Sequence, residues 1–329
     1  MSRRSLARWL VVGMALVSLG LPTSGPSQAS DTPEATPGRA VTGTLLFDLY
    51  YRGWGVWSST FYRTSGTGGR IAAPDARAVA WSTNGARILY EHGPSVWQMR
   101  ADGSHKTLVA RDAAWPAWSP DGRQVVYSAR RTGALWVSRA DGTHRRRLTA
   151  GPAVRPSWSP DGQRIAYDDR HSLFVIDADG SHRTRLVRGG LMPAWAPDGH
   201  AIAFARGSSI FAIGPLGHRQ RLLAVTHHER RPVVGDYAWS PDSHVLAYVR
   251  YYSDHSNLLT VHADGTGKRL IARKAAEVSW SPTGTQLVYL GYPRHRQGLL
   301  NGMVTVSGAK GSNPIGLSPP YCTRPLWRP

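Results

Sequence analysis

The stretch Trp118-Ser119-Pro120-Asp121-Gly122 decides the fold, because the chain repeats it from end to end. A tryptophan in a closely similar setting recurs every 37 to 47 residues, at Trp81, Trp118, Trp158, Trp195, Trp239, Trp280 and Trp327. An aromatic residue follows each of the first six by nine positions, at Tyr90, Tyr127, Tyr167, Phe204, Tyr248 and Tyr289. A constant offset within a constant period is the signature of a repeat architecture.

Each repeat reads as four short strands. Pro-Asp-Gly after the tryptophan predicts a tight turn, since proline presets φ and glycine accepts positive φ. The next strand alternates, as in residues 163–167, and an apolar strand such as residues 173–176 follows. Ala-Asp-Gly then turns the chain again at 101–103, 140–142, 178–180 and 263–265. A four-stranded unit of about 40 residues is typical of a β-propeller blade.

The two ends of the chain decide the predicted number of blades. Residues 44–47, 56–62 and 70–73 look like the last three strands of a blade, and residues 324–327 look like a lone first strand. Joined, they add one blade to the six units and leave no exposed sheet edge. We therefore expect an all-β, seven-bladed propeller over residues 41–329, closed by the C-terminal strand, with six blades as the alternative.

The order of Trp-Ser-Pro-Asp-Gly, Ala-Asp-Gly and Arg-Leu resembles the TolB-like, or WD-like, β-propeller repeat. Residues 118–122 and 158–162 match it fully. The resemblance implies the propeller fold, in a repeat that serves binding proteins and also accompanies peptidase domains. TolB carries an α/β domain before six blades, whereas here the propeller follows a short linker directly. A role in the Tol–Pal envelope system is therefore not carried over.

The first 40 residues read as an export signal and a linker. A basic start and the uncharged run Trp9–Leu21 predict a signal peptide over 1–29, cleaved after Ala29. A twin-arginine and a general secretory route stay open. Residues 30–40 form a linker, and no transmembrane anchor is expected in the mature chain. We therefore expect an exported protein, extracellular or in the periplasm or cell envelope. Cys322 is the one cysteine, so its role as a buried or reactive thiol stays open.

The chain is strongly basic, with 40 Lys and Arg against 21 Asp and Glu. Net charge bears on association rather than on fold. Many of the arginines precede the leucine that closes a repeat, namely Arg145, Arg146, Arg147, Arg183, Arg185, Arg219, Arg221 and Arg269. We refer to these eight as the belt arginines. They either protect the outer strands from pairing with other sheets or hold an anionic polymer.

The sequence gives little indication of a metal site, a cofactor or a catalytic centre. His105, His144 and His182 follow successive Asp-Gly turns, so they lie in different blades and cannot share an ion. The insertion at 227–231 contains two histidines and a glutamate, which fits a solvated loop better than a metal site. Nucleophile-elbow, phosphate-loop and paired-cysteine motifs are missing from the sequence. We expect no metal and no cofactor, and a non-catalytic protein is favoured over an enzyme.

One position of the repeat varies where the framework stays constant. Three residues before the repeat tryptophans stand Ala78, Trp115, Arg155, Met192, Asp236, Glu277 and Arg324. In a propeller, the ends of the first strands of all blades surround the central channel, so residues at the same position of each repeat form a ring around it. The site predicted from the sequence is the channel mouth, with Trp115, Arg155, Met192, Asp236, Glu277 and Arg324 as its binding residues.

Three functions remain open at this point. The first is an exported, monomeric scaffold that binds an unknown envelope or extracellular protein or peptide. The second is a hydrolase or lyase at the channel mouth, with Asp236 and Glu277 as its acid pair. The third is a basic module that binds anionic wall polymer. No nucleic-acid partner is expected.

Overall fold

The structure is a computed structural model of the 329-residue chain. It describes residues 45–53, 56–63, 70–71, 76–225, 236–252, 255–292, 303–316 and 322–328. Side chains are described throughout these ranges, except in 46–53, 56–63, 70–71, 322–324 and at Ala76 and Ala78. The expected signal peptide, the linker and the insertion at 227–231 lie outside the described residues, as does the side chain of Cys322.

The described residues form strands joined by turns, with no helix among them. The first fourteen are β1 (Leu45–Gly53), β2 (Val56–Arg63), β3 (Arg70–Ile71), β4 (Ala76–Trp81), β5 (Arg87–His92), β6 (Ser95–Arg100), β7 (Thr107–Ala110), β8 (Ala113–Trp118), β9 (Gln124–Ala129), β10 (Leu135–Arg139), β11 (Arg146–Arg147), β12 (Val154–Trp158), β13 (Arg164–Asp168) and β14 (Ser172–Asp177). The others are β15 (Thr184–Arg188), β16 (Leu191–Trp195), β17 (Ile202–Arg206), β18 (Ser209–Ile213), β19 (Arg221–Val225), β20 (Tyr237–Trp239), β21 (Val245–Tyr251), β22 (Ser256–His262), β23 (Arg269–Arg273), β24 (Ala275–Trp280), β25 (Gln286–Gly291), β26 (Met303–Gly308), β27 (Ile315–Gly316) and β28 (Cys322–Trp327). Among the described residues, no helix could span a membrane.

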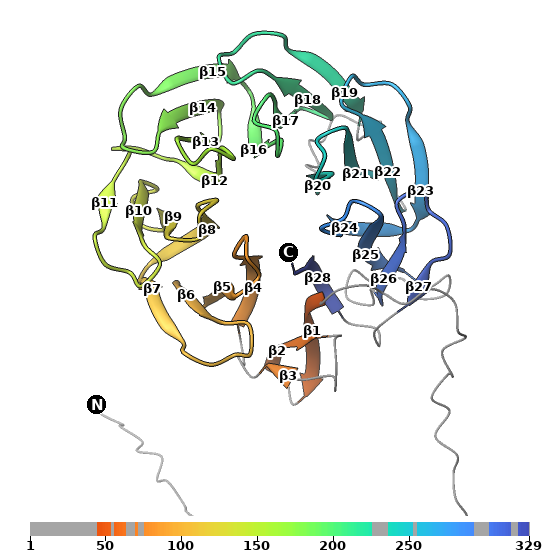
Figure 1. The fold of residues 1–329 in the computed structure, drawn as a ribbon, viewed down its shortest axis with the longest axis horizontal. Coiled ribbons are helices and arrows are strands. Elements are labelled where there is room, and N and C mark those ends of the chain that lie inside the picture. Colours follow the sequence, from red (N-terminus) through yellow and green to blue (C-terminus); the bar gives the residue numbers. More distant parts are fainter. Residues whose placement is uncertain are drawn as a thin grey trace, which may run out of the picture. The chain divides into compact units, whose positions relative to one another are not determined.

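The strands pair into antiparallel four-stranded sheets arranged around a ring (Figure 1). Six sheets each contain four consecutive strands, from β4–β7 to β24–β27. A seventh sheet has the order β28-β1-β2-β3, so it is assembled from both ends of the chain. The expected count of seven blades is corrected to six, the alternative count, because the repeat makes six blades of four consecutive strands. The C-terminal strand β28 pairs with β1 as expected, but the sheet that they form with β2 and β3 is a composite of the two chain ends and not a copy of the repeat.

The serine and aspartate of the Ser-Pro-Asp-Gly turn fasten the first two strands of a blade together. The hydroxyl of Ser119 donates to Asp121 (2.5 Å) and accepts a hydrogen bond from the backbone N–H of Gln124 (2.9 Å). The same bonds recur at Ser159 and at Ser240. The hydrogen bond that Ser119 donates lowers the pKa of Asp121 below its ordinary value, and a hydrogen bond from a backbone N–H lowers it further. Gly122 has φ +67°, which explains why glycine follows the aspartate.

The repeat tryptophans are wedges between blades. Trp158 packs with Val126, Leu135 and Val137 of the preceding blade, and its indole N–H donates to the carbonyl of Ala117 (3.3 Å). Trp239 and Trp280 donate in the same way to the preceding blade, at 3.1 and 3.0 Å. Trp327 of β28 packs against Val288 and Val304 of the β24–β27 blade. The hydrophobic core is thus a series of layers between blades, each filled by one tryptophan.

The wedge tryptophans offer a matched stability test. Trp158 and Trp118 are equally buried, each 8% exposed, but the indole N–H of Trp118 finds no hydrogen-bond partner among the described residues. Both Trp→Phe changes remove the same ring atoms, and only Trp158→Phe also breaks a hydrogen bond. We expect Trp158→Phe to lower the free energy of unfolding by about 1 kcal/mol more than Trp118→Phe, as measured by urea denaturation. Equal losses would show that the indole bond between blades contributes nothing.

Candidate functional site

A β-bulge in the first strand of the blade sets the direction of the variable residue. The pairing of first and second strands shifts register between Ala114 and Ala117 and between Val154 and Ser157. It shifts likewise in β16 and β24. The bulges carry four residues at positive φ, namely Trp115 (+56°), Arg155 (+53°), Met192 (+56°) and Glu277 (+47°). Non-glycine residues rarely adopt positive φ, and bulges redirect side chains at functional sites. The position that varies in sequence is thus the one whose backbone is unusual.

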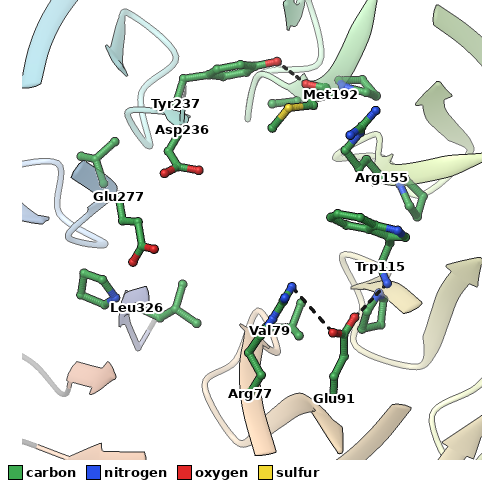
Figure 2. A pocket seen from close by; sticks show the side chains of 16 residues that line it. Arg77, Val79, Glu91, Trp115, Arg155, Met192, Asp236, Tyr237, Glu277 and Leu326 are labelled. Atoms are coloured by element: carbon green, nitrogen blue, oxygen red, sulfur yellow. Dashed lines mark hydrogen bonds and ion pairs between the residues drawn. The ribbon is translucent and has the colours of Figure 1, made fainter. Parts of the chain in front are cut away.

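The bulge residues meet at a cavity of about 390 Å³ at the channel mouth (Figure 2). Five of the six residues predicted from the sequence line it, namely Trp115, Arg155, Met192, Asp236 and Glu277. The sixth, Arg324, belongs to β28, and its side chain is outside the described set. The next two residues of that strand, Pro325 and Leu326, line the cavity.

Four residues at the mouth, two of them carboxylates, were not predicted from the sequence. Glu91, Arg77 and Tyr237 line the cavity, and Asp168 lies directly behind Arg155. Glu91 and Asp168 both stand ten residues after a repeat tryptophan, where the other repeats have Ser128, Ala205, Val249 and Leu290. An acid at an otherwise small or apolar position of the repeat is the signal that could have identified them.

Asp168 organises one half of the mouth. It is fully buried and receives two parallel hydrogen bonds from the guanidinium of Arg155, both 2.8 Å long. It also accepts the backbone N–H of Met192 in the next blade (2.9 Å). The hydroxyl of Tyr237, one blade further on, donates to the carbonyl of Met192. Burial, and then the charge of Asp168, raise the pKa of Tyr237, so its phenol stays protonated. Asp168 therefore joins its own blade to the next, and the carbonyl of Met192 joins that blade to the one after it.

Glu91 plays the corresponding part for Trp115. Its carboxylate accepts the backbone N–H of Trp115 (3.1 Å), and it lies 3.7 Å from Arg77 and 3.9 Å from Arg130. Trp115 itself is 42% exposed, which is unusual for a tryptophan, and the guanidinium of Arg155 lies 5.7 Å from the centre of its ring. The basic and aromatic residues thus form one continuous wall of the mouth, held from behind by two carboxylates.

Asp236 and Glu277 form the opposite wall. Figure 2 shows both carboxylates directed into the cavity, across from Trp115 and Arg77. Burial raises the pKa of Tyr251, and so does the charge of Asp236. The pKa of Tyr292 is raised for the same reasons, with Glu277 as the larger charge. The two acids therefore share one neighbourhood with two tyrosines that stay neutral.

The belt arginines are largely engaged by the protein itself. The guanidinium of Arg146 donates to the carbonyls of Ala178 and Asp179 in the next blade, and Arg221 donates to Ala263 in the same way. Arg145 and Arg183 donate to the hydroxyls of Tyr127 and Tyr167, the aromatic residues of the repeat. These contacts give the arginines a structural role between and within blades, which the sequence analysis did not consider.

The repeated histidines have a backbone explanation. His105, His144 and His182 have φ of +51°, +52° and +48°, at the position after the Asp-Gly turn where Arg219 and Asn313 also have positive φ. Histidine is one of the few residues enriched in this conformation. Within the described ranges, no three His, Cys, Asp or Glu residues gather as a metal ion would require.

Arg155 is predicted to be essential for stability as well as for the mouth. The sequence predicted Arg155 only as a binding residue of the mouth, but its bidentate bond to buried Asp168 also gives it a role in stability. Removing one partner of a buried ion pair costs about 3–5 kcal/mol, because the remaining charge is uncompensated. We expect such a loss in urea denaturation, and we expect Asp168→Asn in the Arg155→Ala background to recover part of it. An unchanged midpoint for Arg155→Ala would contradict this account.

Comparisons with known proteins support the fold and identify the family. A model of the TolB β-propeller domain (PD40) matches residues 74–284. No curated protein matches the sequence. An oligogalacturonate lyase in complex with manganese is 14% identical, with a TM-score of 0.60 over 84% of this chain and 86% of that one. TolB from Acinetobacter baumannii is 16% identical, with a TM-score of 0.53 over 86% and 82%.

A puromycin-hydrolyzing peptidase from Mycobacterium tuberculosis is 14% identical, with a TM-score of 0.61 over 84% of this chain and 53% of that one. Identities this low show a shared fold and nothing about activity. The family model, in contrast, matches well over half of the chain and spans the turns from which the resemblance was first inferred. The chain therefore belongs to the TolB β-propeller family.

Proposed function

We propose that this chain is an exported, non-catalytic binding protein that takes a protein or peptide partner at the channel mouth. The observation that carries the proposal is the convergence of the variable repeat position on one cavity through positive-φ bulges. Backbone conformations of this kind cost of order 1–3 kcal/mol each and tend to persist where function requires them. The partner belongs to the cell envelope or the extracellular space, in keeping with the signal peptide expected over 1–29.

The chemistry of the mouth suits a peptide. Its lining combines an exposed indole, aliphatic and proline side chains, and charges of both signs. Tryptophan and arginine are the residues that most often dominate binding energy in protein interfaces. A cavity of about 390 Å³ lies at the small end of ligand sites, which span roughly 300–1,000 Å³. It accommodates a few side chains of a partner, whose remaining contacts would fall on the surrounding loops.

The wall-polymer function is less well supported. A polymer held by the belt would compete with the protein for its arginines, because Arg145, Arg146, Arg183 and Arg221 are bonded to the protein's own carbonyl and hydroxyl groups. Retention by exposed charges fades steeply with salt. Binding that survives 0.5 M NaCl would therefore favour the mouth over the belt.

Trp115 provides the direct test of the proposed function. The partner is first isolated by pull-down from an envelope extract with the mature chain. Trp115→Ala should then weaken its binding by ~2 kcal/mol, as expected for a hot spot, while the exposure of the ring keeps the loss of stability small. Binding is measured by titration calorimetry, and folding by the thermal midpoint.

Leu222→Ala serves as the matched control. Leu222 is 47% exposed, similar to Trp115, but lies on the outer strand β19. The Leu222→Ala variant should bind the partner with unchanged affinity. If Trp115→Ala binds the isolated partner as tightly as the unmodified chain, the mouth is not the binding site.

A further inference from the structure

A second cavity, of about 820 Å³, lies between the adjoining blades β8–β11 and β12–β15 (Figure 1). We refer to it as the inter-blade groove. The outer strand of the first blade is short beside it, since β11 has two residues whereas β15 of the next blade has five. After β11 the chain leaves the sheet as a loop that lines the groove, and Thr149 of this loop accepts the backbone N–H of Leu135 (2.9 Å). Buried Leu148 and Ile176 also line the groove, so it has an apolar floor.

The groove carries an excess of positive charge. Every lining residue is described, and the charged ones are one acid, Asp169, and four arginines, Arg130, Arg131, Arg170 and Arg183. The guanidinium of Arg130 is set aside, because it lies 3.9 Å from the carboxylate of Glu91. The other three arginines are exposed, and none of them forms an ion pair with a carboxylate of the described residues. A cleft lined by an excess of one sign concentrates ligands of the opposite sign, because its low-dielectric walls focus the field.

Arg183 differs from the other two unpaired arginines because neutral groups hold its side chain. Its guanidinium donates to the hydroxyl of Tyr167 and lies 3.9 Å from the centre of the Phe174 ring. These contacts fix its position and leave its charge unbalanced. The guanidinium groups of Arg131 and Arg170 make no hydrogen bond within the described part of the chain, so both are available to a ligand.

The two available arginines lie where the chain departs from its own repeat. Three positions after the repeat aromatic, two other hairpins have a glycine at positive φ, Gly93 (+55°) and Gly207 (+57°), whereas here Arg170 has φ +72°. Strain of this kind tends to persist where function requires it. Arg131 lies in the hairpin between β9 and β10, which is two residues longer than its counterparts in the repeats on either side. Both departures place an exposed guanidinium on the same groove.

The groove adjoins the mouth along strand β12. Val154 lines the groove, and the next residue, Arg155, lines the mouth. One carboxylate, that of Asp168, accepts both the guanidinium of Arg155 and the backbone N–H of Arg170 (3.0 Å). Each residue of an extended peptide spans about 3.3 Å, so a partner bound against Arg155 reaches the groove within a few residues.

We propose that the inter-blade groove binds an acidic side chain, an aspartate or a glutamate, of the same protein or peptide that occupies the mouth. The carboxylate is received by Arg131 and Arg170, whose planar guanidinium groups match its two oxygens, and its short apolar stem faces the floor of the groove. This inference rests on the proposed function and adds a second subsite with the chemical class of the group bound there.

The test is a selection of random dodecapeptides displayed on phage, carried out in parallel on the mature chain and on an Arg131→Gln, Arg170→Gln variant, the groove variant. A control variant, Arg139→Gln, Arg273→Gln, removes the same net charge at two exposed arginines outside both cavities. We expect all three proteins to have the same thermal midpoint. Peptides selected on the unmodified chain and on the control variant should be enriched in Asp and Glu to the same degree, and those selected on the groove variant should be much less enriched.

A selected peptide is then synthesised, together with a form in which glutamine or asparagine replaces its acidic residue. Fluorescence anisotropy on the unmodified chain and on the control variant should show about tenfold weaker binding for the amide form, equivalent to 1.4 kcal/mol. The groove variant should bind both forms with the same reduced affinity. Trp115→Ala, which leaves the groove in place, should weaken binding of both forms by the same factor.

The outcomes separate this inference from the proposed function. Peptides whose binding depends on Trp115 but not on an acidic residue would overturn the inference and leave the mouth as a binding site. An equal effect of the acid-to-amide change in the groove variant and the control variant would also overturn it, because the attraction would then come from the general positive charge of the protein. Selected peptides whose binding does not depend on Trp115 would overturn both proposals.

Discussion

The structure depends on the wedge that each repeat tryptophan forms between its own blade and the preceding one. A four-stranded blade cannot bury its two faces alone, so its stability comes from the layers between blades. Trp158 shows the arrangement, with its ring against Val126 and Val137 and its N–H on a carbonyl of the preceding blade. Because every blade needs this packing of the ring, with or without the hydrogen bond of the indole, the tryptophan and its turn stay constant along the repeat. Variation is confined to positions that the wedge leaves free.

The variable residue lies only three positions before the wedge, at the opposite end of the same strand. The bulge between them changes the register, so the strand can pack its tryptophan in the core and still direct Trp115 or Met192 into the channel. The unusual backbone is held by carboxylates of the preceding blade, Glu91 for Trp115 and Asp168 for Met192. The framework of the mouth is therefore a set of hydrogen bonds between blades, and a partner meets a surface that is already ordered. Such preorganisation reduces the entropy lost on binding.

Much of this architecture was predictable, because a motif that recurs at a constant spacing places the same residue type at the same point of every blade. The offsets among Trp118, the Pro-Asp-Gly turn and Tyr127 specify strands and turns, and register alone placed Trp115, Arg155 and Glu277 at one mouth. The contacts between blades were not predictable. The bond from Met192 to Asp168 joins residues 24 positions apart, and nothing in either local sequence indicates the other.

Other errors had similar causes. The stability role of Arg155 was missed, since a lone arginine at a variable position gives no sign of a buried acid behind it. The histidines after the Asp-Gly turns were excluded as a shared metal site, but the reason for their presence, a backbone with positive φ, was not recognised. The pairing of β28 with β1 was expected, but the count of seven blades was wrong, because only six of the sheets come from the repeat.

The central claim is that the partner contacts the mouth rather than the outer face of the ring. Site-specific photocrosslinking tests it most directly, with benzoylphenylalanine placed at position 115 or at position 222 and irradiated in an envelope extract. Both positions are exposed, at 42% and 47%, so reagent access is matched. The account predicts a discrete crosslinked product from position 115 and none from position 222. A product from position 222 alone would contradict it.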